Sequence, residues 1–181
     1  MTLRDPEEYT ALRATIRERG TARICVFTFG VSVWAAVTLA TAALSTSPVA
    51  ILLPLVALAA TFEAVLALHV GVERIGRYLQ VFHDDRWEQV AMAFGRPAGA
   101  VHLDALFSAP FSVAALVNLA PMLVAHPVPV EWIFVGGAHA LFLLRVLTAR
   151  AAAARQRAVD LERFTQLKNT RVTMGDAEAQ S

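Results

Sequence analysis

Two side chains of opposite charge each interrupt a long apolar segment. Glu63 follows 39 residues without Lys, Arg, Asp or Glu, and Arg145 comes 13 residues after Trp132. A carboxylate in hydrocarbon is costly unless it faces the interior of a bundle and finds a partner or a proton. At about 1.5 Å per residue, both side chains lie about 20 Å from the uncharged turns that precede them. We therefore expect Glu63 and Arg145 to meet, either as a structural ion pair or as a site that couples protons or substrate.

A polar stripe continues beyond Glu63 on the same predicted helix. Two of its members, His69 and Glu73, are four residues apart, a spacing that suits two metal ligands. Two ligands do not complete a metal site, and the sequence has no His-Glu-x-x-His motif. The alternative is a seam of hydrogen bonds and ion pairs, such as Glu73 with Arg77. The stripe repeats every three or four residues, on one helix face, at His69, Glu73, Arg77, Gln80 and Asp84.

Two further polar side chains fall inside apolar segments. By the same helical rise, Asn118 and His139 lie at a similar depth, about 10 to 12 Å from the outer face. A neutral hydrogen bond between them accounts for both. Haem ligation by His69 and His139 is disfavoured because their depths differ by about 20 Å. We predict no cofactor.

Composition excludes several classes of protein. The chain has 181 residues, is 56% hydrophobic and carries a formal net charge of +1. Its mean hydropathy is +0.52. The arginines alternate with Asp and Glu, which gives no basic surface for nucleic acid. A single cysteine, Cys25, rules out an intrachain disulfide and a paired-cysteine metal site.

The uncharged segments are long enough to cross a membrane, since a span needs about 20 apolar residues for about 30 Å of hydrocarbon. The 39 residues between Arg23 and Glu63 suit two spans separated by a turn at Ser45–Pro48, and 26 more uncharged residues lie between Asp104 and Glu131. We predict an all-α fold, a four-span transmembrane helical bundle with long cytoplasmic helix extensions. The predicted spans are about 24–44, 49–72, 105–125 and 132–148.

The distribution of basic residues predicts the orientation. None of the 16 Lys and Arg residues lies in the connections Ser45–Pro48 and His126–Glu131. An excess of Lys and Arg in short flanking segments marks the cytoplasmic side. Four spans with both termini in the cytoplasm is the one arrangement that keeps all 16 on the same side. We therefore predict a multi-pass protein with both termini in the cytoplasm, and the Ala- and Arg-rich composition favours a bacterial-type inner membrane.

Most of the chain outside the spans is also predicted to be helical. Asp5 and Pro6 open an N-terminal helix that we expect to stop at Gly20. Asp84 is the predicted cap of a short helix over 85–94, with loop at Gly95–Gly99. The predicted divisions are an amphipathic N-terminal helix at 1–23, the membrane domain at 24–148 with a cytoplasmic segment at 73–104, a helix at 149–168 that continues span four, and a disordered tail at 169–181.

Three function classes fit these patterns. The first is a non-enzymatic scaffold or accessory subunit that contacts the lipid bilayer and either self-associates or joins a larger membrane complex. The second is a small proton-coupled transporter or channel that uses Glu63, with His69, Glu73, Arg77 and Gln80 at its inner mouth. The third is a membrane enzyme acting on a lipid or quinone. The sequence shows no catalytic motif, so we favour the first class.

Overall fold

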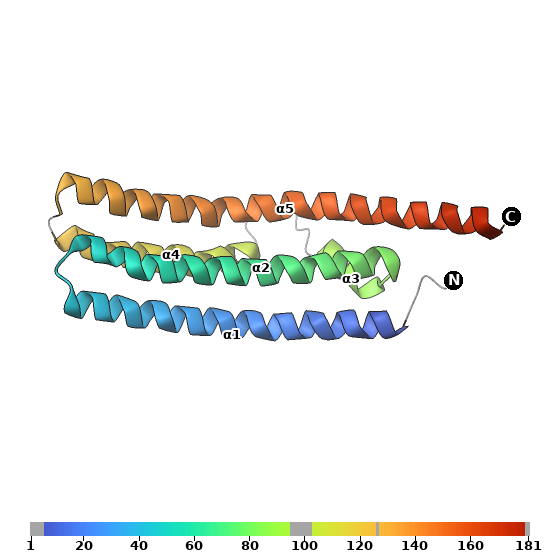
Figure 1. Ribbon diagram of the computed structural model, residues 1–181, viewed down its shortest axis with the longest axis horizontal. Helices are drawn as coiled ribbons and strands as arrows, with labels where there is room; N and C mark the ends of the chain where they lie inside the picture. The colour runs from blue at the N-terminus through green and yellow to red at the C-terminus, as the bar shows by residue number, and fades with distance from the viewer. Residues whose placement is uncertain (1–5, 95–102, 126, 180–181) are drawn as a thin grey trace. The chain divides into compact units, whose positions relative to one another are not determined.

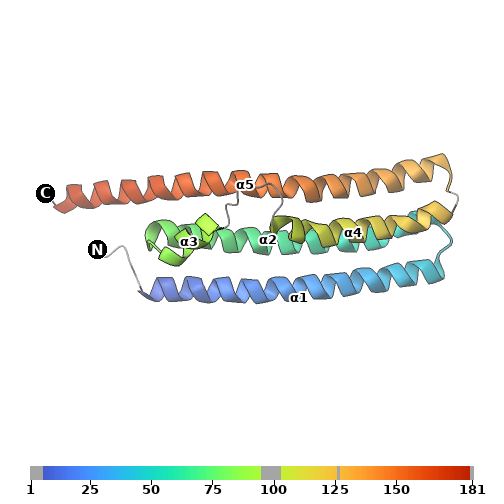
Figure 2. The same cartoon turned by 180° about the vertical axis from the view of Figure 1, so that it is seen from behind.

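The computed structural model describes the backbone of residues 6–94, 103–125 and 127–179, so the loop predicted at Gly95–Gly99 lies outside it. Every element in this part of the chain is helical, as predicted. Six elements follow one another: α1 (Pro6–Leu44), the 3-10 helix η1 (Pro48–Ile51), α2 (Leu52–Phe82), α3 (Arg86–Phe94), α4 (Leu103–Val124) and α5 (Pro129–Ala179). Figures 1 and 2 show them from opposite sides.

The ends of the helices follow local chemistry. α1 begins at Pro6 with Glu7 and Glu8 in its first turn, where proline needs no amide donor and acidic groups favour the positive end of the helix dipole. α5 begins at Pro129, and the carboxylate of Glu131 accepts a hydrogen bond from the amide of Val128 at 2.9 Å. This helix therefore starts three residues before the predicted position.

Two predicted helix ends are wrong. α1 does not stop at Gly20 but continues as one helix to Leu44, since a single helical glycine costs only about 1 kcal/mol. The tail that we predicted to be disordered from 169 is helical as far as Ala179. No proline interrupts that stretch, and the free-energy cost of its one glycine is again too small to end the helix.

The chain divides into two compact units. The first, which we name the apolar unit, comprises Ala22–Ala67 and Val101–Ala151. The second, which we name the charged unit, comprises Met1–Thr21, Leu68–Ala100 and Ala152–Ser181. Of the 31 charged residues of the sequence, only six fall in the apolar unit: Arg23, Glu63, Asp104, Glu131, Arg145 and Arg150.

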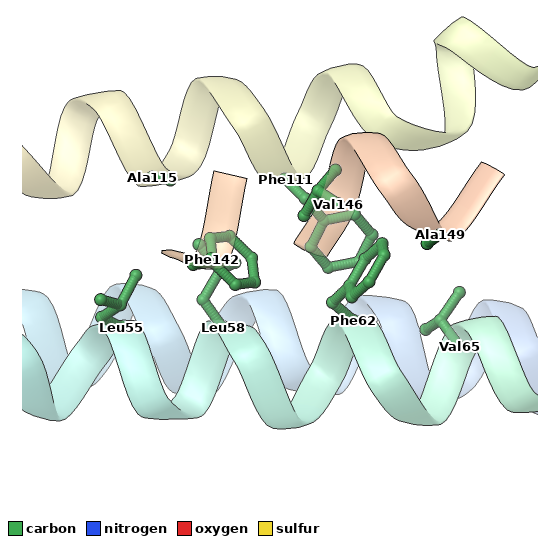
Figure 3. Close-up of a cluster of buried hydrophobic side chains, with 9 residues drawn as sticks. All are labelled: Leu55, Leu58, Phe62, Val65, Phe111, Ala115, Phe142, Val146 and Ala149. Atoms are coloured by element: carbon green, nitrogen blue, oxygen red, sulfur yellow. The ribbon is translucent and has the colours of Figure 1, made fainter. Parts of the chain in front are cut away.

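The apolar unit has a core of aromatic and branched side chains between α2, α4 and α5. Figure 3 shows Leu58 and Phe62 of α2 directed toward Phe142 and Val146 of α5. The ring of Phe62 meets those of Phe111 and Phe142 edge to face, with centroids 5.2 and 6.0 Å apart. Such pairs add to the free energy gained from burying their area.

The outer surface of the apolar unit is also apolar. In the most hydrophobic 18-residue window of α1, only 6% of residues are buried. Soluble monomers rarely expose so much contiguous apolar surface. Large exposed side chains occur on all four of its long helices, for example Phe29, Leu53, Val113, Leu116, Phe134 and Leu141.

Three helical stretches are long and apolar enough to cross a membrane: Pro6–Leu44, Pro48–Phe82 and Pro129–Thr170. The apolar stretch Ser108–Val124 of α4 is shorter, and only the described residues enter this assessment. The four-span bundle predicted from the sequence is therefore supported for three helices and remains a prediction for α4.

The charged unit is held together by ion pairs and a small aromatic cluster. Tyr78 stacks on Phe82 with ring centroids 4.6 Å apart, and both rings meet Phe164 of α5 edge to face. α3 folds back beside the C-terminal end of α2, as Figures 1 and 2 both show. The cap of α3 is Asp85 rather than the predicted Asp84, because the Asp85 carboxylate accepts a hydrogen bond from the amide of Trp87 at 3.0 Å.

Candidate functional site

The structure brings together the two charged residues that interrupt the apolar segments. Arg145 Nε lies 2.8 Å from Glu63 Oε1, and Arg145 Nη2 donates to Glu63 Oε2 at 2.8 Å. Both carboxylate oxygens are therefore bound by one guanidinium, the planar two-point arrangement that makes arginine pairs strong and specific. The guanidinium carbon also lies 6.0 Å from the ring centroid of Phe62.

This ion pair lies on the outer surface of the apolar unit, which corrects our expectation that Glu63 faces the bundle interior. The side chains of Glu63 and Arg145 are 49% and 46% exposed. Phe62 and Val65 of α2 occupy the interior positions instead, and the two residues between them, Glu63 and Ala64, are exposed. Sequence reasoning missed this because α2 is apolar on nearly every face, and no periodicity marks the buried one.

Asn118 and His139 form a buried polar group, as their matching depths suggest. Asn118 Nδ2 lies 3.1 Å from His139 Nε2 and donates to the carbonyl of Ile51 at 2.9 Å. His139 Nδ1 lies 2.8 Å from the carbonyl of Val135. The two side chains are 1% and 2% exposed, so these hydrogen bonds are buried where they join α4, α5 and η1.

In the charged unit, α2 and α5 are joined by a cluster of arginines and carboxylates. Arg77 is only 2% exposed and donates to Asp160 at 2.9 Å, while Arg74 contacts the same carboxylate oxygen at 3.3 Å. Glu73 is bound at both oxygens by Arg157, at 2.9 and 3.0 Å. Sequence reasoning did not single out Asp160, although it is the one acidic residue between Glu131 and Glu162.

A second ionic cluster joins α1 to the end of α2 and to α3. Arg13 forms ion pairs with Asp85 and with Glu88, the latter at 2.8 Å, and Tyr9 Oη donates to Asp85 at 3.0 Å. Burial acts to raise the pKa of Asp85, but the Tyr9 hydroxyl, the Arg13 charge and the Trp87 amide outweigh burial and hold that pKa below its ordinary value.

The polar stripe of α2 is part of these clusters. His69 Nε2 lies 3.5 Å from Glu73, and Arg77 Nη1 lies 3.6 Å from the same residue. Gln80 is half-buried and Asp84 is exposed. Glu73 contacts three cationic or imidazole groups, those of His69, Arg77 and Arg157, which form a seam of polar contacts with it. Among the residues that the structure describes, no group of three or more His, Cys, Asp or Glu side chains is placed to hold a metal ion.

Comparison with known proteins adds no family. No protein-family model, curated protein or solved structure was found to match this chain. The class of this protein is therefore inferred from its own sequence and structure. The described part of the chain is all-helical, with three helices of the length and hydropathy that cross membranes.

Proposed function

We propose that this protein is a multi-pass membrane scaffold or accessory subunit without enzymatic activity. In this proposal the apolar unit lies in the bilayer of a bacterial-type inner membrane and both termini lie in the cytoplasm. The apolar exterior of α1, α2 and α5 supports a lipid environment. In the same proposal, the charged unit supplies the polar surface that faces the cytoplasm.

The observation that carries the proposal is the exposed pair of Glu63 and Arg145. A half-exposed ion pair in an otherwise apolar surface is costly against lipid tails, whereas a neighbouring protein helix with polar groups of its own stabilises it. Small side chains flank the pair on α2, namely Ala60, Ala64 and Ala67, all of them exposed. Small residues allow close approach of another helix in a membrane.

The geometry favours this function over a transporter that uses Glu63. Both oxygens of Glu63 are already bound by Arg145, so the carboxylate is engaged in an ion pair rather than directed at an open pathway. A cavity in the apolar unit is lined by Asn118 and Ile51, and Glu63 is not among its lining residues. The inner-mouth residues Glu73 and Arg77 are bound to α5.

The test compares Glu63→Gln, Arg145→Gln and the double variant in detergent and in proteoliposomes. Each single variant leaves one partner uncompensated and should lower the free energy of unfolding by about 1–3 kcal/mol, between the values for exposed and buried pairs. The double variant should recover most of that loss. Glu162→Gln, a change on an exposed residue, should have almost no effect. A stable Glu63→Gln variant that abolishes a measured proton flux would instead establish the transporter.

Photo-crosslinking tests for the partner directly. A photoreactive residue at position 64, beside Glu63, should give a protein adduct in native membranes. The same residue at position 113, which is 58% exposed on α4, should react chiefly with lipid. Equal lipid labelling at both positions would contradict the scaffold proposal.

A further inference from the structure

The apolar unit contains a cavity of about 220 Å³ where the end of α1 meets η1, α2 and α4. Its walls combine apolar side chains such as Ile51 and Met122 with the hydroxyl residues Thr38, Thr41 and Ser45. No charged side chain is among its lining residues. Several of them are exposed, including Ala42 and Ser47, so the cavity opens to the surface of the apolar unit.

Asn118 lines this cavity, and its hydrogen bonds fix which way its amide points. The carbonyl of Val135 only accepts, so His139 Nδ1 carries the proton and His139 Nε2 accepts from Asn118 Nδ2. The carbonyl of Ile51 takes the second hydrogen of that same nitrogen. If the amide were rotated by 180°, its oxygen would face two other acceptors, His139 Nε2 and the carbonyl of Ile51. Asn118 Oδ1 therefore stays an acceptor.

Asn118 is only 1% exposed. Its Oδ1 atom is buried and has no hydrogen-bond partner among the described residues. Thr38, a nearby wall residue, donates its hydroxyl hydrogen to the carbonyl of Trp34 at 2.7 Å. An unpaired buried acceptor is costly, so a donor is expected there. Asn118 is a lining residue of the cavity, which makes the cavity the candidate place for that donor.

We propose that this cavity binds the uncharged, hydroxyl-bearing head of an amphiphile, which donates a hydrogen bond to Asn118 Oδ1. An apolar cavity of about 150 Å³ holds a benzene molecule, so 220 Å³ suits a glyceryl-sized head. Whole drug-sized ligands occupy about 300 Å³ or more, so the acyl chain lies outside. The lack of charged lining residues disfavours a phosphate head. This site does not depend on the scaffold proposal.

The test measures thermal unfolding of the full chain in lauryldimethylamine oxide, a detergent whose head has no hydrogen-bond donor. The probes are 1-monoolein, methyl oleate and glycerol. We expect 1-monoolein to raise the unfolding midpoint saturably, by about 5–10 °C when it is well above its dissociation constant. Methyl oleate, which has no hydroxyl, should not. A saturable shift with glycerol as well would identify a free polyol as a second source of the same head.

Two neighbouring alanines of α1 provide matched variants. Ala42 lines the cavity and Ala43 does not, and both are exposed. Ala42→Phe should abolish the shift, and Ala43→Phe should keep it. Thr41→Val, which removes a wall hydroxyl, should weaken it. The proposal is overturned if methyl oleate acts like 1-monoolein, if Ala42→Phe keeps the shift, or if neither hydroxyl probe binds, since water alone then satisfies Asn118.

Discussion

The carboxylate of Asp85 shows how single residues organise the charged unit. It accepts hydrogen bonds from Tyr9 on α1 and from the amide of Trp87 on α3, and it forms an ion pair with Arg13. Its side chain is only 7% exposed. One ionised group therefore caps α3 and anchors the first turns of α1, and its charge state controls both contacts.

This role predicts an acid-dependent loss of stability. The pKa of Asp85 is lower in the folded protein than its ordinary value of 3.8. Its contribution is therefore complete above about pH 4 and is lost as the pH falls through the lower folded-state value. Asp85→Asn should lower the free energy of unfolding by about 1–3 kcal/mol at pH 7, and this difference should narrow as the pH falls below about 4.

Thermal unfolding of both proteins between pH 7 and pH 3 measures the gap. Glu162→Gln is the control, because Glu162 is exposed and accepts a hydrogen bond from Gln166 of the same helix, at 3.3 Å. Its difference from the unchanged protein should be near zero throughout. A gap for Asp85→Asn that stays constant as the pH falls would show that its charge is not the source of the stability.

At the scale of the elements, Gly30 lets α1 and α2 approach each other in the apolar unit. It is the one buried residue of α1, and a Cβ atom added there would collide with the side chain of Thr61. Thr61 is held in place because its hydroxyl donates to the carbonyl of Ala57 at 2.8 Å and because β-branched side chains have few rotamers in a helix.

Gly30→Ala should therefore destabilise the apolar unit by about 1–3 kcal/mol. Gly137→Ala is the matched control, because nothing lies within 4 Å of a Cβ at Gly137, so alanine there should stabilise its helix by about 0.5–1 kcal/mol. The double change Gly30→Ala with Thr61→Ala should restore part of the loss. Unfolding midpoints in detergent provide the measurement, and equal effects at both glycines would contradict close packing at Gly30.

Much of the helical framework could be predicted from the sequence, because helix ends depend on local chemistry. The predicted turn at Ser45–Pro48 falls where α1 ends and η1 begins, and the end of α1 at Leu44 agrees with the predicted boundary. The continuation through Gly20 could not be predicted from the glycine alone. Depth along a helix follows from residue counting, which is why Glu63 and Arg145 were expected to meet. Their outward direction depends on packing between helices, and uniformly apolar helices do not encode it locally.

At the scale of the whole molecule, α4 determines the number of membrane crossings. As a helix of 22 residues it spans about 33 Å, enough for the hydrocarbon of a bilayer. The part of it that qualifies as apolar, Ser108–Val124, is shorter than the other three candidates. The proposed orientation requires α4 to cross, because three crossings would place the basic residues of α5 opposite those of α2 and α3.

Cysteine accessibility distinguishes four crossings from three. In a Cys25→Ser background, we expect Ser47→Cys to react with a membrane-impermeant maleimide in intact cells, since the connection before η1 carries no Lys or Arg. Gln89→Cys on α3 and Thr165→Cys on α5, both at exposed positions, should react only after permeabilisation. An even number of crossings puts these two positions on the same side. If Thr165→Cys reacts in intact cells while Gln89→Cys does not, α4 does not cross, and the proposed orientation is wrong.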